Sequence, residues 1–177
     1  MADAQQPQHD RPEEEMRQKV REMIQGITVC MFVTVDEDGS LRSRPMRAQV
    51  QPDRDGRTLW FYSKSSSPKN EEIGHDGRVL LAYADPGSQD YVSVYGRAEV
   101  VHDKAKQKEL WSEGLRVWFP QGPESDDVSL IRVTMLGAQY WDSPSSTLVH
   151  AYGYVKAVAT GKPPAGGEVE KVSFRAA

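Results

Sequence analysis

Apolar residues recur at helical spacing near the N-terminus and at strand spacing through much of the remaining chain. In "DRPEEEMRQKVREMIQG", the positions of Met16, Val20, Met23 and Ile24 predict an amphipathic helix, with Asp10 and Glu13 as its cap and Gly26 as its end. Two strand-like runs follow on either side of the turn "DEDG", and we expect a β-hairpin there. Later runs also predict strands, the last of them one strand or two: "TLWFYS", "RVLLAYAD", "DYVSVYGRAEVV" and "VSLIRVTMLGAQYW".

Helical signals are fewer in the second half of the chain. The segment "KAKQKELWSEGLRVWF" predicts another amphipathic helix, whose shared face consists of Leu110, Trp111, Leu115 and Trp118. Ser143 followed by Pro144 predicts the start of a further helix. Hairpin-connected strands with so few crossover helices favour a mainly β fold, a six-stranded antiparallel barrel with flanking helices, over a parallel α/β sheet. We assign residues 11–160 to this domain, and residues 1–10 and 161–177 to polar tails.

Two residues mark expected irregularities in the strands. Pro45 cannot donate a hydrogen bond to a neighbouring strand, so its position should be a sheet edge or a bulge, where a site can lie. Gly96, in "YGR", is a lone glycine within a strand. It predicts a bulge where backbone or a ligand approaches closely.

Composition narrows the functional classes. The formal net charge is -4, and basic and acidic residues are interspersed, so we expect no nucleic-acid or membrane partner. The single cysteine, Cys30, lies in an apolar run and is expected to fill core space rather than act as a nucleophile. We find no secretory signal or membrane-spanning run and expect a cytoplasmic protein.

Catalytic and metal signatures are weak. The histidines, His9, His75, His102 and His150, are scattered, no two lie at metal-ligand spacing, and no metal is expected. No serine stands in a Gly-x-Ser-x-Gly elbow, and no dinucleotide-binding fingerprint is present. We therefore name no catalytic residue.

The stretch "FYSKSSSPKNEEI" carries the strongest chemical signal. Ser67 before Pro68 predicts a helix start, with the serine hydroxyl accepting a hydrogen bond from a first-turn amide. Lys69 in that first turn is disfavoured, because the helix dipole is positive there. A bound phosphate would explain it, since amides, serine hydroxyls, Lys69 and Lys64 would then converge on one anion. The alternative is a solvated lysine on a capped surface helix.

Arginines add weight to the phosphate hypothesis. In "LRSRPMRAQV", Arg42 and Arg44 fall on one face of the strand with Met46, and Arg47 falls on the other. An arginine fork binds phosphate oxygens well. The alternative is that edge-strand charges discourage aggregation.

The sequence as a whole resembles the flavin-binding split-barrel family that includes the pyridoxamine phosphate oxidases. Within this family, it resembles the bacterial general stress protein branch. The resemblance covers Met16 to Lys162 and depends on the order of several motifs, among them "VTVDEDGSLRSRPM", "LWFYSKSSSPKNEEI", "LWSEGLRVWFPQG" and "YWDSPSS". It implies a split β-barrel that binds FMN, or FAD, in a groove between the two barrels of a homodimer.

The resemblance also implies roles for particular residues. Arg44, Pro45 and Met46 would line the edge of the flavin ring, while Ser63, Lys64, Ser67 and Lys69 would hold the ribityl chain and the phosphate. Tyr91 lies on a strand that often places a residue near the ring. Trp141 matches the tryptophan with which the second subunit covers the cofactor. The aromatic residues Trp111, Trp118 and Phe119 are expected to lie partly in the dimer interface.

Two departures from the oxidases bear on function. The oxidases carry Ser-Arg-Lys at the phosphate, where this chain has Ser67, Pro68 and Lys69. They also carry a C-terminal Arg-x-His segment that grips pyridoxamine phosphate, and none follows Trp141. We therefore expect flavin-dependent redox chemistry on another small molecule. The alternatives are a flavin-binding stress protein without turnover and a deazaflavin-dependent reductase.

Overall fold

The computed structural model describes residues 13–49, 56–142 and 168–174. The helix expected from Ser143 and the N-terminal tail lie outside the described residues. The elements, in chain order, are α1 (Glu13–Gly26), β1 (Val29–Val35), β2 (Leu41–Gln49), β3 (Thr58–Lys64), α2 (Pro68–His75), β4 (Arg78–Asp85), β5 (Asp90–Val101), α3 (Lys104–Glu109), the 3₁₀ helix η1 (Glu113–Val117), β6 (Val128–Asp142) and β7 (Glu168–Ser173).

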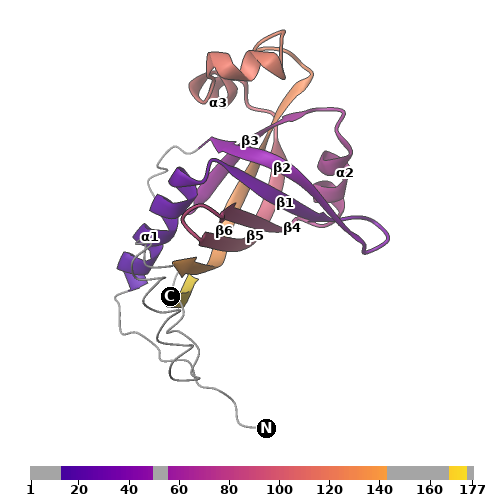
Figure 1. Ribbon diagram of the computed structural model, residues 1–177. Helices are drawn as coiled ribbons and strands as arrows, with labels where there is room; N and C mark the ends of the chain where they lie inside the picture. Colours follow the sequence, from indigo (N-terminus) through magenta and orange to yellow (C-terminus); the bar gives the residue numbers. More distant parts are fainter. Residues whose placement is uncertain (1–12, 50–55, 143–167, 175–177) are drawn as a thin grey trace, which may run out of the picture.

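Six antiparallel strands close into a barrel, which confirms the predicted fold class (Figure 1). They are ordered β3-β2-β1-β4-β5-β6, and pairing between β3 and β6 closes the ring. The ladder between β2 and β3 is short, with Ala48 opposite Phe61 and Gln49 opposite Trp60. Pro45 lies on the part of β2 beyond this ladder, opposite Met31 of β1. The barrel is therefore split beside Pro45, as expected for a proline in a strand.

The helices lie on different sides of the barrel (Figure 1). The helix α1 runs along one side, α2 lies on the opposite side, and the segment with α3 stands above the barrel. The apolar face predicted for α1 is confirmed, because Val20, Met23 and Ile24 are buried. None of the described helices is both long and apolar enough to cross a membrane.

The main core fills the barrel. Its residues come from every barrel strand and from α1, and Phe32 and Phe61 meet edge to face with ring centres 5.0 Å apart. Cys30 is buried within this core, as predicted, and burial raises the pKa of its thiol to about 11. An inert thiol at neutral pH fits the role of a core filler.

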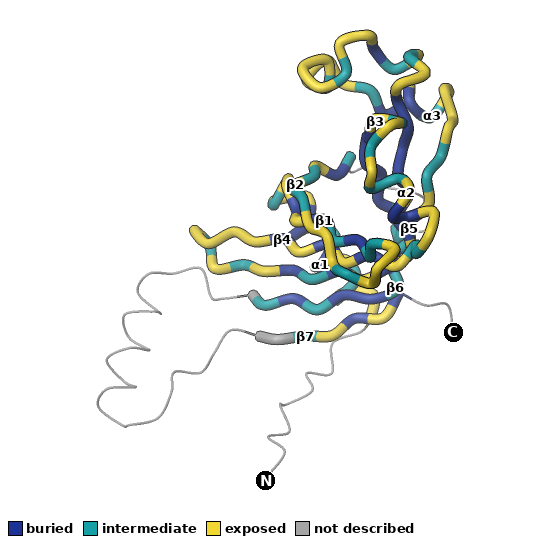
Figure 2. Tube along the Cα trace, turned by 90° about the vertical axis from the view of Figure 1, so that its right-hand side faces the viewer, coloured by how far each residue is buried: buried dark blue, intermediate teal, exposed yellow. Residues whose placement is uncertain are grey.

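A second apolar cluster joins the α3 segment to the barrel. Strand β3 is buried on both faces, so Leu59 and Phe61 enter the main core while Trp60 and Tyr62 enter this cluster. Most residues of the α3 segment are exposed or of intermediate burial (Figure 2). The continuous helix predicted here is wrong, because α3 ends at Glu109 and a 3₁₀ turn follows. Trp118 consequently leaves the shared face and is 70% exposed.

Strand β7 lies within the segment that the sequence assigned to a tail. It pairs with the second half of β6, and Val172 and Phe174 enter the main core. Arg17 of α1 donates a hydrogen bond to the carbonyl of Ser173 at 2.8 Å. The packed domain therefore includes residues beyond 160.

The bulge predicted at Gly96 is confirmed. The register between β5 and β6 shifts at Tyr95 and Gly96, and a β-carbon at Gly96 would collide with the carbonyl oxygen of Thr134. The backbones of β5 and β6 therefore approach each other at Gly96 more closely than a residue with a β-carbon would allow.

We expect Gly96→Ala to lower the free energy of unfolding by about 1 to 3 kcal/mol, because the added methyl group forces the two backbones apart. Urea denaturation of the purified variant measures the loss. Gly114→Ala is the matched control, since nothing lies within 4 Å of its β-carbon position, and it should be neutral or slightly stabilising. Equal stability of the two variants would contradict the close approach.

Candidate functional site

The start of α2 lies directly after the serine loop that follows β3. Ser67 is the N-cap residue and Pro68 occupies the first turn, as predicted. The predicted cap hydrogen bond is wrong, because the Ser67 side chain makes no bond to a first-turn amide. Its hydroxyl instead accepts a hydrogen bond from the Lys69 ammonium at 2.7 Å. No side chain caps this helix start: Pro68 has no amide hydrogen, the Asn70 amide donates to the Ser67 carbonyl at 2.9 Å, and the Lys69 ammonium lies at the Ser67 hydroxyl.

The Lys69 ammonium lies at the start of α2, where a positive charge is unfavourable. Burial lowers the pKa of this ammonium, the nearby Arg44 lowers it further, and Glu72 partly opposes both. A lowered pKa means that the protein disfavours the charged form of the lysine. An anion bound beside Lys69 would reverse this effect. The position fits ligand binding better than a solvated surface lysine.

Arg44 is anchored by two residues that the sequence did not single out as a site. Its guanidinium donates to the Glu72 carboxylate at 2.7 Å and to the Thr34 hydroxyl at 2.5 Å. The Thr34 hydroxyl in turn donates to Glu72. The Glu72 side chain is only 10% exposed and that of Arg44 24%. We call Thr34, Arg44 and Glu72 the anchor triad, and it ties α2 to β1 and β2.

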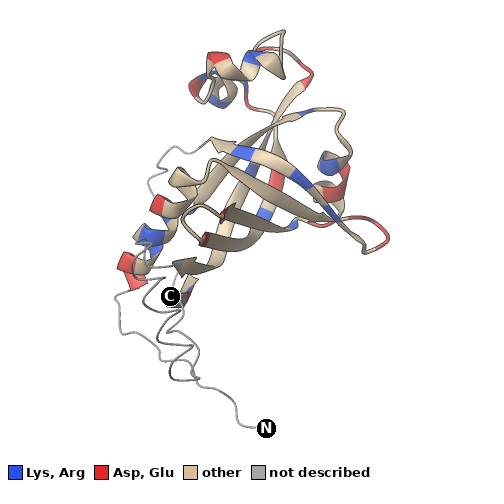
Figure 3. Cartoon of the chain, in the orientation of Figure 1, with Lys and Arg blue, Asp and Glu red and all other residues tan. Residues whose placement is uncertain are grey.

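The three arginines of β2 have different environments. Arg42 and Arg44 share a face of the strand, opposite Thr34 and Phe32 of β1. Arg42 pairs with Asp36 at 2.9 Å on the surface of the hairpin. Arg47 is exposed. Figure 3 shows basic residues along β2 and both basic and acidic residues on α2. Arg44 is the member of this group that contacts α2.

The serine loop is shaped by Asn70, which sequence reasoning missed. Its amide nitrogen donates to the carbonyls of Lys64 and Ser65 and to the Ser129 hydroxyl, each at 3.1 Å. The Ser63 hydroxyl is buried and donates to the Asn70 side-chain oxygen at 2.9 Å. Ser63 therefore supports the loop from within. Lys64 is exposed at the end of β3.

The remaining predicted site residues lie at two places. Pro45 is exposed on the open edge of β2, and Met46 packs partly against the core. Tyr91 and Trp141 form a cross-strand pair between β5 and the end of β6. Lys64, by contrast, pairs with Val128 at the start of β6. Within one chain, Tyr91 and Trp141 are thus at the other end of β6 from the serine loop.

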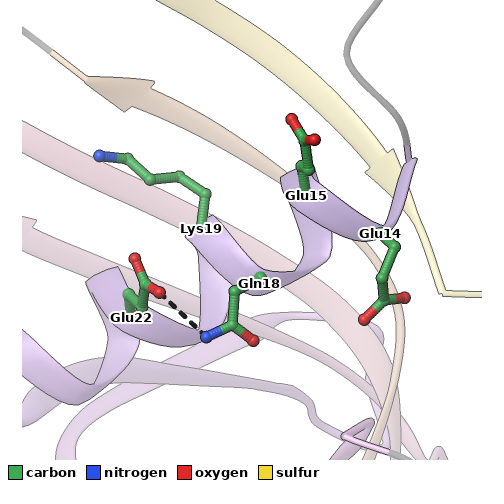
Figure 4. Close-up of a pocket in the computed structure, with 5 residues that line it drawn as sticks. All are labelled: Glu14, Glu15, Gln18, Lys19 and Glu22. Atoms are coloured by element: carbon green, nitrogen blue, oxygen red, sulfur yellow. Dashed lines mark hydrogen bonds between the residues drawn. The ribbon is translucent and has the colours of Figure 1, made fainter.

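A hollow of about 510 Å³ lies along α1 but offers little to an anion (Figure 4). Its lining residues are Glu14, Glu15, Gln18, Lys19 and Glu22, all from one helix. The Gln18 amide donates to Glu22 at 2.9 Å. Because three of these five residues are acidic, we do not place the site here. Within the described ranges, no group of three or more His, Cys, Asp or Glu residues is arranged to hold a metal ion.

Comparison with known proteins identifies the family. The family model described as pyridoxamine 5'-phosphate oxidase like matches residues 15–165. The chain therefore belongs to the pyridoxamine 5'-phosphate oxidase-like family.

Similar proteins come from fungi and bacteria. Protein bli-3 of Neurospora crassa is 27% identical over 168 residues, a match that covers 88% of this chain and 80% of bli-3. The crystal structure of the general stress FMN/FAD binding protein from Xanthomonas citri is 27% identical, with a TM-score of 0.64, and the match covers 75% of this chain and 92% of that one. General stress protein 26 from Bacillus anthracis is 23% identical, with a TM-score of 0.62, over 71% of this chain and 93% of that one.

We expect Glu72→Ala to lower the free energy of unfolding by about 3 kcal/mol, because it leaves the largely buried Arg44 guanidinium without its counter-charge. Denaturant titration measures the loss. The double variant Arg44→Ala with Glu72→Ala should lose less than the sum of the two single variants. Arg42→Ala is the control, because its exposed pair with Asp36 is worth less than about 1 kcal/mol. Additive losses would show that the two charges do not interact.

Proposed function

We propose that this protein binds a flavin, FMN or FAD, through its phosphate at the start of α2. The proposal is based on the half-buried Lys69 ammonium, which donates to the Ser67 hydroxyl at 2.7 Å at a helix start without a side-chain cap. Helix amides and a lysine ammonium are the groups that bind phosphate in many proteins. The related Xanthomonas citri protein, whose name describes it as FMN/FAD binding, supports the choice of ligand.

The charges at this site fit a phosphate. Arg44 and Lys69 carry two positive charges, and Glu72 compensates one of them, so an anion would meet a net positive site. Lys69 and Ser67 would bind phosphate oxygens directly. Arg44 retains partly exposed surface beside Glu72 and would add a longer-range attraction. Ser63 acts through Asn70, by fixing the shape of the loop.

A bound flavin would supply redox chemistry, and the protein would hold and orient it. The substrate we propose is a nicotinamide or another small organic molecule. Two sequence features argue against pyridoxamine phosphate itself: Pro68 replaces the arginine of the oxidases' Ser-Arg-Lys run, and no Arg-x-His segment follows Trp141. A flavin-binding role without turnover remains the second candidate.

We further propose that the protein is a homodimer with the flavin at the interface. One outward face of the barrel is apolar, with exposed side chains on β1, β4 and β5: Val29, Met31, Leu80, Tyr91 and Tyr95. Strand pairing places them in adjacent rows, since Val33 lies opposite Leu80 and Leu80 opposite Tyr95. A continuous apolar sheet face is typical of a surface that a partner covers. Tyr91 and Trp141 lie side by side at one end of this face.

We expect Lys69→Gln to weaken FMN binding at least tenfold, because a charge-assisted bond to phosphate contributes about 1.5 to 3 kcal/mol. The melting temperature of the flavin-free protein should stay the same or rise slightly, because a disfavoured ammonium is removed. Fluorescence titration with FMN and a thermal melt measure the two effects.

The matched control for this variant is Lys108→Gln, which removes an equal charge from the exposed face of α3. Its FMN affinity should equal that of the wild type. Unchanged affinity in Lys69→Gln would refute the phosphate site.

We expect Met31→Lys, in the middle of the apolar face, to convert the dimer to a monomer, because the lysine would be desolvated in the interface. Light scattering at micromolar concentration should give about twice 19.8 kDa for the wild type and 19.8 kDa for the variant. Gln25→Lys is the control, since Gln25 is exposed on α1, outside this face and outside the segment that carries Trp118. A monomeric wild type would disprove the dimer.

A further inference from the structure

A second cleft shares a wall with the serine loop. It has a volume of about 100 Å³, and Lys64 lines it together with Trp118, Pro120, Gln121 and Asp127. Lys64 is the residue that joins the two sites, because its carbonyl accepts hydrogen bonds from the Ser67 amide at 3.0 Å and from Asn70 at 3.1 Å. The cleft therefore begins where the proposed phosphate site ends.

Hydrogen bonds hold the far wall of the cleft against the serine loop. The Ser65 amide donates to the Asp127 carbonyl, and the Ser65 hydroxyl donates to the Asp126 carbonyl, both at 2.9 Å. These bonds join residues far apart in the sequence. They fix the distance between the helix start of α2 and the segment that carries Trp118.

The turn that carries Trp118 is held against the barrel beside this cleft. Trp111 and Phe119 pack against Tyr62, with ring centres 5.8 and 5.7 Å away, and so secure the segment to the barrel. The amides of Trp118 and Phe119 both donate to the Leu115 carbonyl at 2.9 Å. The indole itself remains 70% exposed. The turn is thus held in place while its largest side chain stays free of the core.

The cleft, like the proposed phosphate site, contains a lysine that can attract a phosphate group. Among the described residues, the Lys64 ammonium has no hydrogen-bond or ion-pair partner, so it is available to a second phosphate group. An exposed indole stacks well on a nucleobase. The Asp127 carboxylate at the cleft provides a hydrogen-bond acceptor for an exocyclic amino group, while the Gln121 side-chain oxygen already accepts a hydrogen bond from the Ser125 hydroxyl at 3.0 Å.

From this order of groups we propose that the cleft is an adenine subsite, which makes FAD the preferred flavin. The first phosphate lies at Ser67 and Lys69, the second beside Lys64, and the adenine stacks on Trp118. The proposal rests on the proposed flavin site and adds to it the reason for choosing the dinucleotide.

The test compares FMN and FAD on the same protein. Fluorescence titrations of the full-length wild type should show FAD binding more tightly than FMN. Trp118→Ala should weaken FAD binding about tenfold, within the range expected for loss of one base–aromatic stack, and change FMN binding less than twofold. Trp118→Phe should retain most of the FAD affinity, because it keeps an aromatic face. Since Trp118 is largely exposed, both variants should melt at the wild-type temperature.

If the wild type binds FMN as tightly as FAD or more tightly, FAD is not the preferred flavin and the adenine subsite is refuted. If the wild type binds FMN but Trp118→Ala leaves FAD affinity unchanged, the adenine subsite is refuted and the flavin site stands. If Trp118→Ala weakens both flavins equally and alters the mass measured by light scattering, Trp118 is a dimer contact and the subsite is again refuted. If the wild type binds neither flavin, both proposals fail.

Discussion

The salt bridge between Arg44 and Glu72 determines how the candidate site is assembled. It joins the open edge of β2 to α2, and Thr34 completes it from β1. Two charges that are largely withdrawn from water must stay together, because separating them leaves one uncompensated. The start of α2, and with it Lys69, is therefore fixed relative to the split in the barrel. The same salt bridge determines the net charge of the site, because Glu72 neutralises Arg44 and leaves the positive charge of Lys69 uncompensated.

The split itself explains why the site lies here. A closed barrel has no free strand edges, but the ladder between β2 and β3 is limited to Ala48 and Gln49 on the β2 side. Pro45 keeps the adjoining part of β2 from donating to another strand. The serine loop leaves β3 on the other side of this gap. Backbone and side-chain groups thus converge from two strands that do not pair at this point.

Local patterns in the sequence predicted much of the fold. The apolar spacing in α1, the proline at the edge of β2 and the bulge at Gly96 each follow from a few neighbouring residues, and each is confirmed. The prediction of a continuous helix through Trp118 was wrong because the chain changes to a 3₁₀ turn, which alters the spacing of residues that share a helix face. Strand β7 was missed because a Gly/Pro-rich stretch precedes its six residues.

The site was predictable only in part, for a related reason. Lys69 and Ser67 stand out because they break the rules of a helix start, which is a local signal. Glu72 and Asn70 do not stand out, because their roles depend on Arg44 and Ser129, residues that folding brings from distant strands. Pairings of this kind leave no mark in the spacing of a single sequence. Asn70 in particular resembles an ordinary polar residue on a short helix until its three donor bonds are seen.

The length of β6 has a consequence for how the protein tolerates damage. Its first half pairs with β3 and its second half with β7, while β5 pairs along both halves. Proteolytic loss of residues 168–174 would keep the strand pairings of the barrel ring, but it would remove Val172 and Phe174 from the main core and expose the second half of β6 as an unprotected strand edge. Such an edge can recruit strands from other molecules, so this loss would promote aggregation as well as lower stability.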